Sequence, residues 1–197
     1  MIPANEALER LRSGNRRFAA DLAAGGSGTT IARRAEVVDG QEPFAIILGC
    51  SDSRVPAELV FGQGLGDLFV IRVAGNIVAP SQVGSVEFAA ERYRTRLVVV
   101  LGHSQCGAVL ATLEEMARPA GSQSPNLRSI VNRIRPAVEG LTDASQAVRA
   151  NVRASAAHLR HGSAVLEHLV LTNGLRIVGA EYSLETGVVD FFDTLEL

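Results

Sequence analysis

The sequence contains no tryptophan and only two cysteines, two tyrosines and two methionines among its 197 residues. It also has no lysine, so all 19 of its basic residues are arginines. Without lysine there is no Schiff-base lysine, no pyridoxal phosphate anchor and no Walker-type phosphate-binding loop. Two cysteines are too few for a disulfide scaffold in a chain of this length. Both cysteines therefore need another explanation.

The chain also lacks a strong charge imbalance and a long apolar run. Its net charge is -2, with 21 acidic and 19 basic residues spread along the sequence, so no basic stripe indicates nucleic acid and no polybasic segment indicates a membrane. No apolar run approaches the ~20 residues that cross a bilayer, and the N-terminus has no secretory signal pattern. These absences predict a cytoplasmic protein that acts on a small molecule.

The pattern of apolar runs predicts one α/β domain over residues 1–197. The hydrophobic content of 47% is enough for a substantial core. Four short apolar runs alternate with helix-like segments, which is typical of a mostly parallel sheet covered by helices. The core strands are expected at residues 44–48, 68–73, 97–101 and 175–178. Residues 181–184 and 188–192, separated by Glu-Thr-Gly, predict a hairpin that adds an edge strand.

Residues 1–30 are predicted to be a helical arm and tether, ahead of a catalytic core over residues 41–197. Within the arm, residues 4–22 indicate two short helices broken at residues 13–14, with Asn5 and Asn15 as helix caps. The apolar positions of these helices form a stripe: Leu8, Leu11, Phe18 and Leu22. The glycine-rich tether that follows would let the arm reach a partner subunit.

Two polar segments each follow a buried strand of the predicted sheet. Residues 50–54 (CSDSR) follow the first run, and residues 103–106 (HSQC) follow the third. Because the carboxyl ends of parallel strands form the ligand-binding edge of such sheets, both cysteines are expected at that edge. The His-x-x-Cys pair can place a nitrogen and a thiolate on one ion, and a helix N-terminus favours the thiolate. Cys50 would supply a third ligand from the neighbouring strand.

Zinc suits this set of donors. It accepts two thiolates and an imidazole, and three protein ligands leave a fourth position for water, as in catalytic sites. Asp52 can project toward the same ion and either ligate it or accept a hydrogen bond from its water. Arg54 can hold Asp52 in a two-pronged ion pair that keeps the carboxylate ionised. These residues predict a catalytic zinc centre.

Each residue has a plainer interpretation when taken alone. A single cysteine is more often a small buried hydrophobe, a single histidine is often a core residue, and Asp52 with Arg54 could form a structural ion pair. The gathering of all these groups at two strand ends favours a site. A redox cysteine pair would have Cys-x-x-Cys spacing, and a non-catalytic zinc module would not need Asp52 and Arg54.

Together, residues 50–54 and the His103-x-x-Cys106 pair resemble the paired signature of the β-class carbonic anhydrases. The match extends over about residues 41–109 and includes three further segments: GDLFVIR at 66–72, AGN at 74–76 and GSVEF at 84–88. The resemblance implies reversible hydration of carbon dioxide to bicarbonate and a proton, by attack of zinc-bound hydroxide on CO2. An enzyme with the same fold and metal that hydrolyses carbon disulfide or carbonyl sulfide is the alternative.

The resemblance also implies a role for each site residue. The zinc ligands are Cys50, His103 and Cys106, for one Zn2+ per chain; the catalytic pair is Asp52 and Arg54; the substrate pocket contains Gln41, Phe69, Ala74 and Phe88. In a closed state of some relatives, Asp52 would become the fourth zinc ligand. The family builds its pocket at a subunit interface, so a homodimer or a dimer of dimers is expected.

Some bacterial relatives carry a regulatory bicarbonate site made of a tryptophan, an arginine and a tyrosine. Arg72 and Tyr182 match two of these residues, but Ile47 stands where the tryptophan would be. The regulatory site is therefore not expected here. Without it, the open arrangement with Asp52 paired to Arg54 is predicted to prevail at neutral pH.

Overall fold

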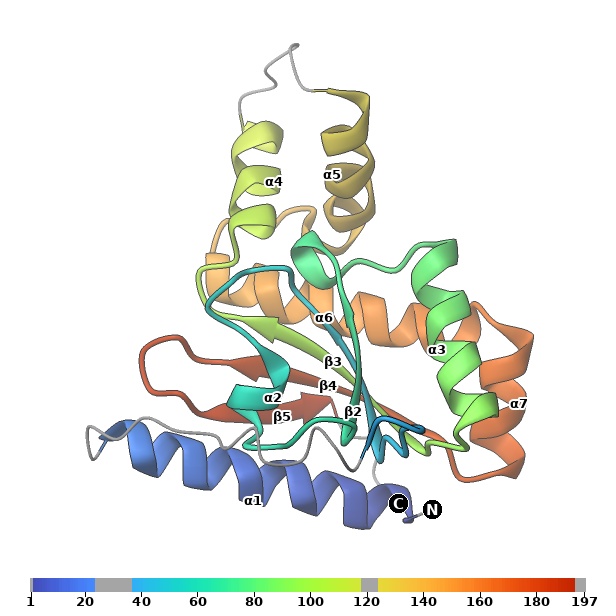
Figure 1. Ribbon diagram of the computed structural model, residues 1–197. Coiled ribbons are helices and arrows are strands. Elements are labelled where there is room, and N and C mark those ends of the chain that lie inside the picture. Colours follow the sequence, from blue (N-terminus) through green and yellow to red (C-terminus); the bar gives the residue numbers. More distant parts are fainter. Residues whose placement is uncertain (1, 24–36, 118–123, 194–197) are drawn as a thin grey trace.

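The computed structural model describes residues 2–23, 37–117 and 124–193, which form one five-stranded sheet with helices on both faces (Figure 1). The strands are β1 (Ala45–Gly49), β2 (Leu68–Arg72), β3 (Leu97–His103), β4 (Arg176–Tyr182) and β5 (Val189–Asp193). The helices are α1 (Ala4–Ala23), α2 (Ala57–Val60), α3 (Pro80–Arg92), α4 (Gly107–Ala117), α5 (Pro125–Val138), α6 (Ala144–His161) and α7 (Ala164–Thr172), with a short 3-10 turn, η2 (Ala74–Asn76). Within these ranges, no helix has the length and apolar content needed to span a membrane. The predicted tether lies outside the described residues.

The sheet has the order β2-β1-β3-β4-β5. Its first four strands are parallel, and β5 pairs antiparallel with β4. The four predicted core strands and the edge hairpin are therefore confirmed. Two strands run further than the apolar runs predicted, because β3 and β4 stay paired as far as His103 and Tyr182. This extension carries His103 to the carboxyl edge of the sheet.

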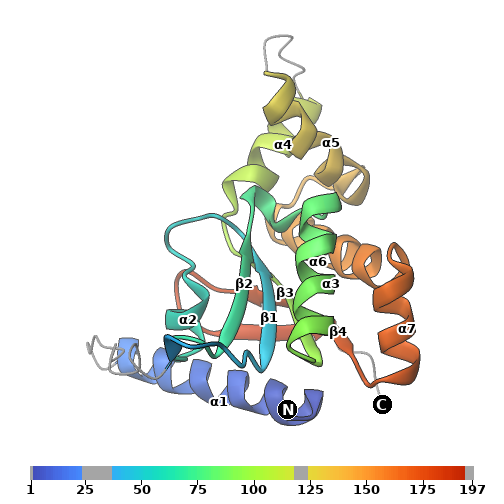
Figure 2. The same cartoon turned by 45° about the vertical axis from the view of Figure 1, so that its right-hand side comes forward.

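Both faces of the sheet are buried, which explains why the strands read as continuous apolar runs. Ile46 and Leu48 belong to the core under α3, α6 and α7. Ala45 and Ile47, which point the other way, belong to the core under α1 and α2. Figure 2 shows these two groups of helices on opposite sides of the strands. The strand ends are left free to carry polar residues.

α1 is a single helix over Ala4–Ala23, so the predicted break at residues 13–14 is wrong. Gly14 is helical and lies where α1 approaches the loop after α2. A Cβ atom at this position would meet the Phe61 carbonyl oxygen at 1.7 Å. The glycine therefore permits a close approach between two backbones rather than a helix end.

Asn15 does not cap a helix, contrary to the prediction. It is buried inside α1, and its Nδ2 donates to the carbonyl oxygens of Val60 at 3.0 Å and Gly187 at 2.8 Å. Its Oδ1 accepts from the backbone amide of Val189 at 2.8 Å. This one side chain ties α1 to α2 and to the β4–β5 hairpin of the same chain.

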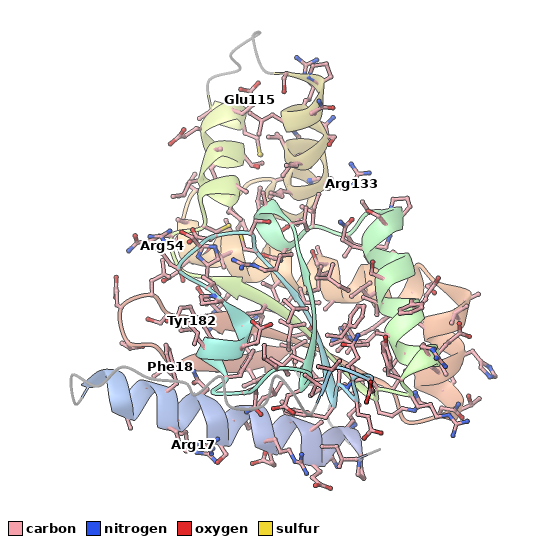
Figure 3. All side chains as sticks on the ribbon, in the orientation of Figure 1. Arg17, Phe18, Arg54, Glu115, Arg133 and Tyr182 are labelled. Atoms are coloured by element: carbon pink, nitrogen blue, oxygen red, sulfur yellow. The ribbon has the colours of Figure 1, made fainter. Side chains whose placement is uncertain are left out.

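The apolar stripe of α1 also packs within its own chain. Leu8 and Leu11 are buried in the core beneath the sheet, and the Phe18 ring lies 6.5 Å from that of Tyr182 (Figure 3). The stripe on these three residues therefore gives no reason to expect a partner subunit over α1. The predicted reach of the arm to a partner subunit stays a prediction.

Candidate metal centre

Three potential metal ligands converge at the carboxyl edge of the sheet. Cys50 follows β1, His103 ends the neighbouring strand β3, and Cys106 precedes α4. Their ligand atoms all lie within 4.8 Å of one another, and all three residues are buried. Residues far apart in the sequence thus meet because parallel strands end together.

The imidazole of His103 is oriented for a metal. Its Nδ1 lies 2.9 Å from the Ser104 carbonyl oxygen, which assigns the ring proton to Nδ1. The other nitrogen, Nε2, is buried and has no hydrogen-bond partner. A buried polar atom left unpaired costs free energy, and an unprotonated imidazole nitrogen is a common metal ligand. The orphaned Nε2 therefore fits a bound cation.

The two sulfurs compete for a proton when no cation is bound. A hydrogen bond from the Cys106 thiol and a smaller contribution from the Gly75 amide lower the pKa of Cys50 to about 4, against the opposing effect of burial. The Cys50 sulfur in turn raises the pKa of the Cys106 thiol, and burial raises it further. A divalent cation at the centre would take the place of this proton. Two thiolates and an imidazole form a donor set that zinc prefers.

Asp52 lies beside the three ligands as an ionised carboxylate. The Arg54 guanidinium donates from Nε to Oδ1 at 2.9 Å and from Nη2 to Oδ2 at 2.7 Å, and the Arg54 amide donates to Oδ1 at 3.0 Å. These bonds hold the pKa of Asp52 well below its usual range. Asp52 Oδ2 is 3.8 Å from the orphaned nitrogen of His103. Figure 3 shows Arg54 in the loop at the carboxyl edge, below α4.

Arg72 anchors the backbone of this loop. Its Nε donates to the Cys50 carbonyl oxygen at 2.9 Å, and its Nη2 donates to the Asp52 carbonyl oxygen at 2.5 Å. The sequence connects Arg72 only with a regulatory site. The signal for this second role was its position, because Arg72 ends β2 directly opposite Gly49, the residue before Cys50.

The four expected substrate residues fall into two groups. Ala74 lies in η2, whose next residue, Gly75, donates its amide to Cys50 Sγ at 3.4 Å. Gln41, Phe69 and Phe88 lie at the opposite, amino end of the parallel strands. Phe69 pairs with Ile46, the second residue of β1. Cys50 is four residues beyond Ile46, a distance of roughly 13 Å along an extended strand.

This second group forms an aromatic cluster around Tyr93. The rings of Phe69, Phe88 and Tyr93 lie 5.8 to 6.2 Å apart, and Gln41 Nε2 donates to the Tyr93 hydroxyl at 3.1 Å. Phe88 is 51% exposed, so part of its ring faces solvent. The cluster presents an apolar surface with an amide at its edge.

Comparison with known proteins identifies the family. Residues 45–189 match the family model described as carbonic anhydrase. The chain belongs to the carbonic anhydrase family. It is 37% identical over 189 residues to carbonic anhydrase 2 of Mycobacterium tuberculosis, with 92% of this chain and 89% of the relative covered. It is 38% identical over 192 residues to a carbonic anhydrase of Mycolicibacterium smegmatis, with 93% and 91% covered.

The fold of this carbonic anhydrase is that of the β class. A tetrameric β-carbonic anhydrase from Sordaria macrospora superposes with a TM-score of 0.71 at 23% identity, covering 91% of this chain and 93% of that one. The sequence did not predict the contributions of Gly75, which it gave only as part of the AGN segment, or of Tyr93. The Gly75 amide contacts a sulfur through its backbone, which side-chain patterns do not reveal, and Tyr93 follows a helix without any motif of its own.

Proposed function

We propose that this member of the family is a zinc-dependent enzyme that interconverts carbon dioxide and bicarbonate, with one Zn2+ per chain. The observation that carries the proposal is the meeting of Cys50, His103 and Cys106 beside an ionised Asp52. Both named relatives are carbonic anhydrases. This favours hydration of carbon dioxide over hydrolysis of carbon disulfide or carbonyl sulfide.

Cys50, His103 and Cys106 would hold the zinc ion through two sulfurs and Nε2. Zinc supplies Lewis acidity, which in carbonic anhydrases makes water nucleophilic near neutral pH. The protein residues around it keep the thiolates and the imidazole in the required protonation states. Their burial keeps competing solvent away from the ligands.

Asp52 would orient the attacking nucleophile. Arg54 donates two hydrogen bonds to Oδ1 and one to Oδ2. Oδ2 therefore keeps a lone pair free on the side that faces the metal ligands. The carboxylate accepts a hydrogen bond there and so directs an oxygen lone pair at the carbon of CO2. Arg54 keeps Asp52 from taking up the proton itself, because its guanidinium stabilises the ionised form.

The substrate pocket would need a second copy of the chain. Ala74 lies near the metal ligands, whereas Gln41, Phe69 and Phe88 lie at the other end of the sheet in the same chain. In a two-fold dimer, the exposed aromatic cluster of one copy would complete the pocket of the other. A dimer, or a dimer of dimers, follows from this division. A cytoplasmic location stays a prediction from the sequence.

The test is stopped-flow CO2 hydration with metal analysis on the same sample. The purified protein is expected to contain about one zinc per chain and to hydrate CO2. Activity should disappear when a chelator removes the zinc and return when zinc is restored. Cys106→Ser should lose most of the metal and the activity together. A fully zinc-loaded protein that does not hydrate CO2 would contradict the proposal.

A further inference from the structure

Two buried polar side chains of α6 hydrogen-bond to the turn η2, next to the candidate metal centre, and not to its ligands. Asn151 is 2% exposed, and its Nδ2 donates to the Gly75 carbonyl oxygen at 2.8 Å. Ser155 is 6% exposed, and its Oγ donates to the Asn76 carbonyl oxygen at 3.1 Å. The two residues are four positions apart and so share one face of the helix. That face holds two consecutive carbonyl groups of η2.

The segment they hold has an unusual backbone. Gly75 has φ of 71° and Asn76 has φ of 43°, two successive residues in the left-handed region. Such conformations persist only where the surroundings fix them. A larger residue at Gly75 would be strained, because its φ lies in the left-handed region and a Cβ atom would meet Ile134 Cδ1 at 2.8 Å. The turn is therefore held from outside by α5 and α6.

The amide of this turn is directed at a sulfur. Gly75 N lies 3.4 Å from Cys50 Sγ and donates to it. Two bonds hold the peptide group between Gly75 and Asn76: Asn151 Nδ2 donates to its carbonyl oxygen, and its N–H, that of Asn76, donates to the Val73 carbonyl oxygen at 3.0 Å. The Gly75 N–H belongs to the preceding peptide group, so these bonds act on its direction through the backbone angles of Gly75. A hydrogen bond to a thiolate withdraws electron density from the sulfur and so weakens its donation to a metal.

We propose that Asn151, supported by Ser155, is a positioning residue that aims the Gly75 amide at Cys50 Sγ and thereby tunes this sulfur as a metal ligand. The proposal rests on the function proposed above. It assigns to Asn151 and Ser155 an influence on the chemistry of a centre to which neither side chain has a hydrogen bond. A purely structural role would lower stability without altering the electronic state of the sulfur.

The experiment replaces zinc with Co(II) and records the sulfur-to-cobalt charge-transfer band. The wild type is compared with Asn151→Ala and with Ser155→Ala, a milder change that removes only a hydroxyl. Loss of the N–H···S bond raises the energy of the sulfur lone pairs, so the band should move to longer wavelength, further in Asn151→Ala. The affinity for zinc in Asn151→Ala should change by about tenfold or more, as for other residues that orient metal ligands.

Thr95→Val is the matched control. Thr95 is also fully buried and donates its Oγ1 to a backbone carbonyl oxygen, that of Pro43 at 2.7 Å, at the amino end of the strands. This variant should lose stability but keep the band and the zinc affinity of the wild type. Cobalt is added to the folded protein, and circular dichroism confirms the fold of each variant.

The outcomes separate the two proposals. A cobalt-loaded wild type without any sulfur-to-metal band would show that the cysteines do not ligate the metal, and the function proposal would fail. A normal wild-type band that stays in place in the α6 variants would overturn the role of Asn151 alone. If Asn151→Ala does not fold, the band of Ser155→Ala decides the question, because a smaller shift in the same direction is still expected.

Discussion

Replacing Asp52 by asparagine tests the catalytic pair while preserving its shape. Arg54 presents only N–H donors to the carboxylate. An asparagine at position 52 would keep its oxygen at the Oδ1 position, where Arg54 donates twice, and place its NH2 group at the Oδ2 position, which lies 3.8 Å from His103 Nε2, at the cost of the single Arg54 bond to Oδ2. A donor would then stand where the nucleophile needs an acceptor. The exchange of acceptor for donor affects orientation and not metal binding.

The expected loss in kcat is about 10²- to 10⁴-fold, the range for a positioned group that handles a proton. Zinc content should stay near one per chain, because the three ligands are untouched. The assay is stopped-flow CO2 hydration with metal analysis and a thermal melt on each sample. Asp190→Asn is the control. Asp190 lies on β5 and is another carboxylate paired with an arginine, Arg149 of α6. Wild-type activity in Asp52→Asn, or loss of zinc from it, would refute the assigned role.

Two further predictions concern the subunit interface and the docking of α1. Gln41→Ala is expected to impair activity without loss of zinc, and a co-expressed heterodimer of Gln41→Ala and Asp52→Asn chains should regain activity. One of its two sites combines the intact residues of both chains, whereas a site built within one chain would show no recovery. Asn15→Ala leaves two carbonyls and one amide unpaired in the core. It should lower the free energy of unfolding by about 3 kcal/mol, measured by chemical denaturation; an unchanged midpoint would contradict this.

Much of the fold was predictable because the strands are buried on both faces and read as plain apolar runs. The polar residues that follow two of these runs marked the metal centre for the same reason, since parallel strands end together. The end of the sheet at which Gln41 lies was also predictable from the sequence. It precedes β1 whereas Cys50 follows it, so the two residues must lie at opposite ends of the sheet.

The remaining features depend on contacts that no local pattern encodes. Gly14 resembles a helix breaker until the backbone of residue 61 is seen beside it. Asn15 has the residue type of a helix cap, and only the fold brings it to its three backbone partners at the end of α2 and in the β4–β5 hairpin. The helical stretches over residues 127–172 were the least informative part of the sequence. They nevertheless contain α6, whose Asn151 reaches the turn behind the metal centre.

The reach of Asn151 depends on a glycine in β3. A Cβ atom at Gly102, the residue before His103, would meet Val152 Cγ2 at 2.5 Å and Val148 Cγ1 at 3.3 Å. α6 can therefore lie this close to the sheet only because position 102 has no side chain. Gly102→Ala should push α6 away and shift the cobalt charge-transfer band in the direction of Asn151→Ala. Gly49→Ala is the control, because a Cβ atom there would meet nothing nearer than 3.9 Å. If Gly102→Ala kept the wild-type band, as Gly49→Ala is expected to do, the direction of the Gly75 N–H would not depend on the position of α6.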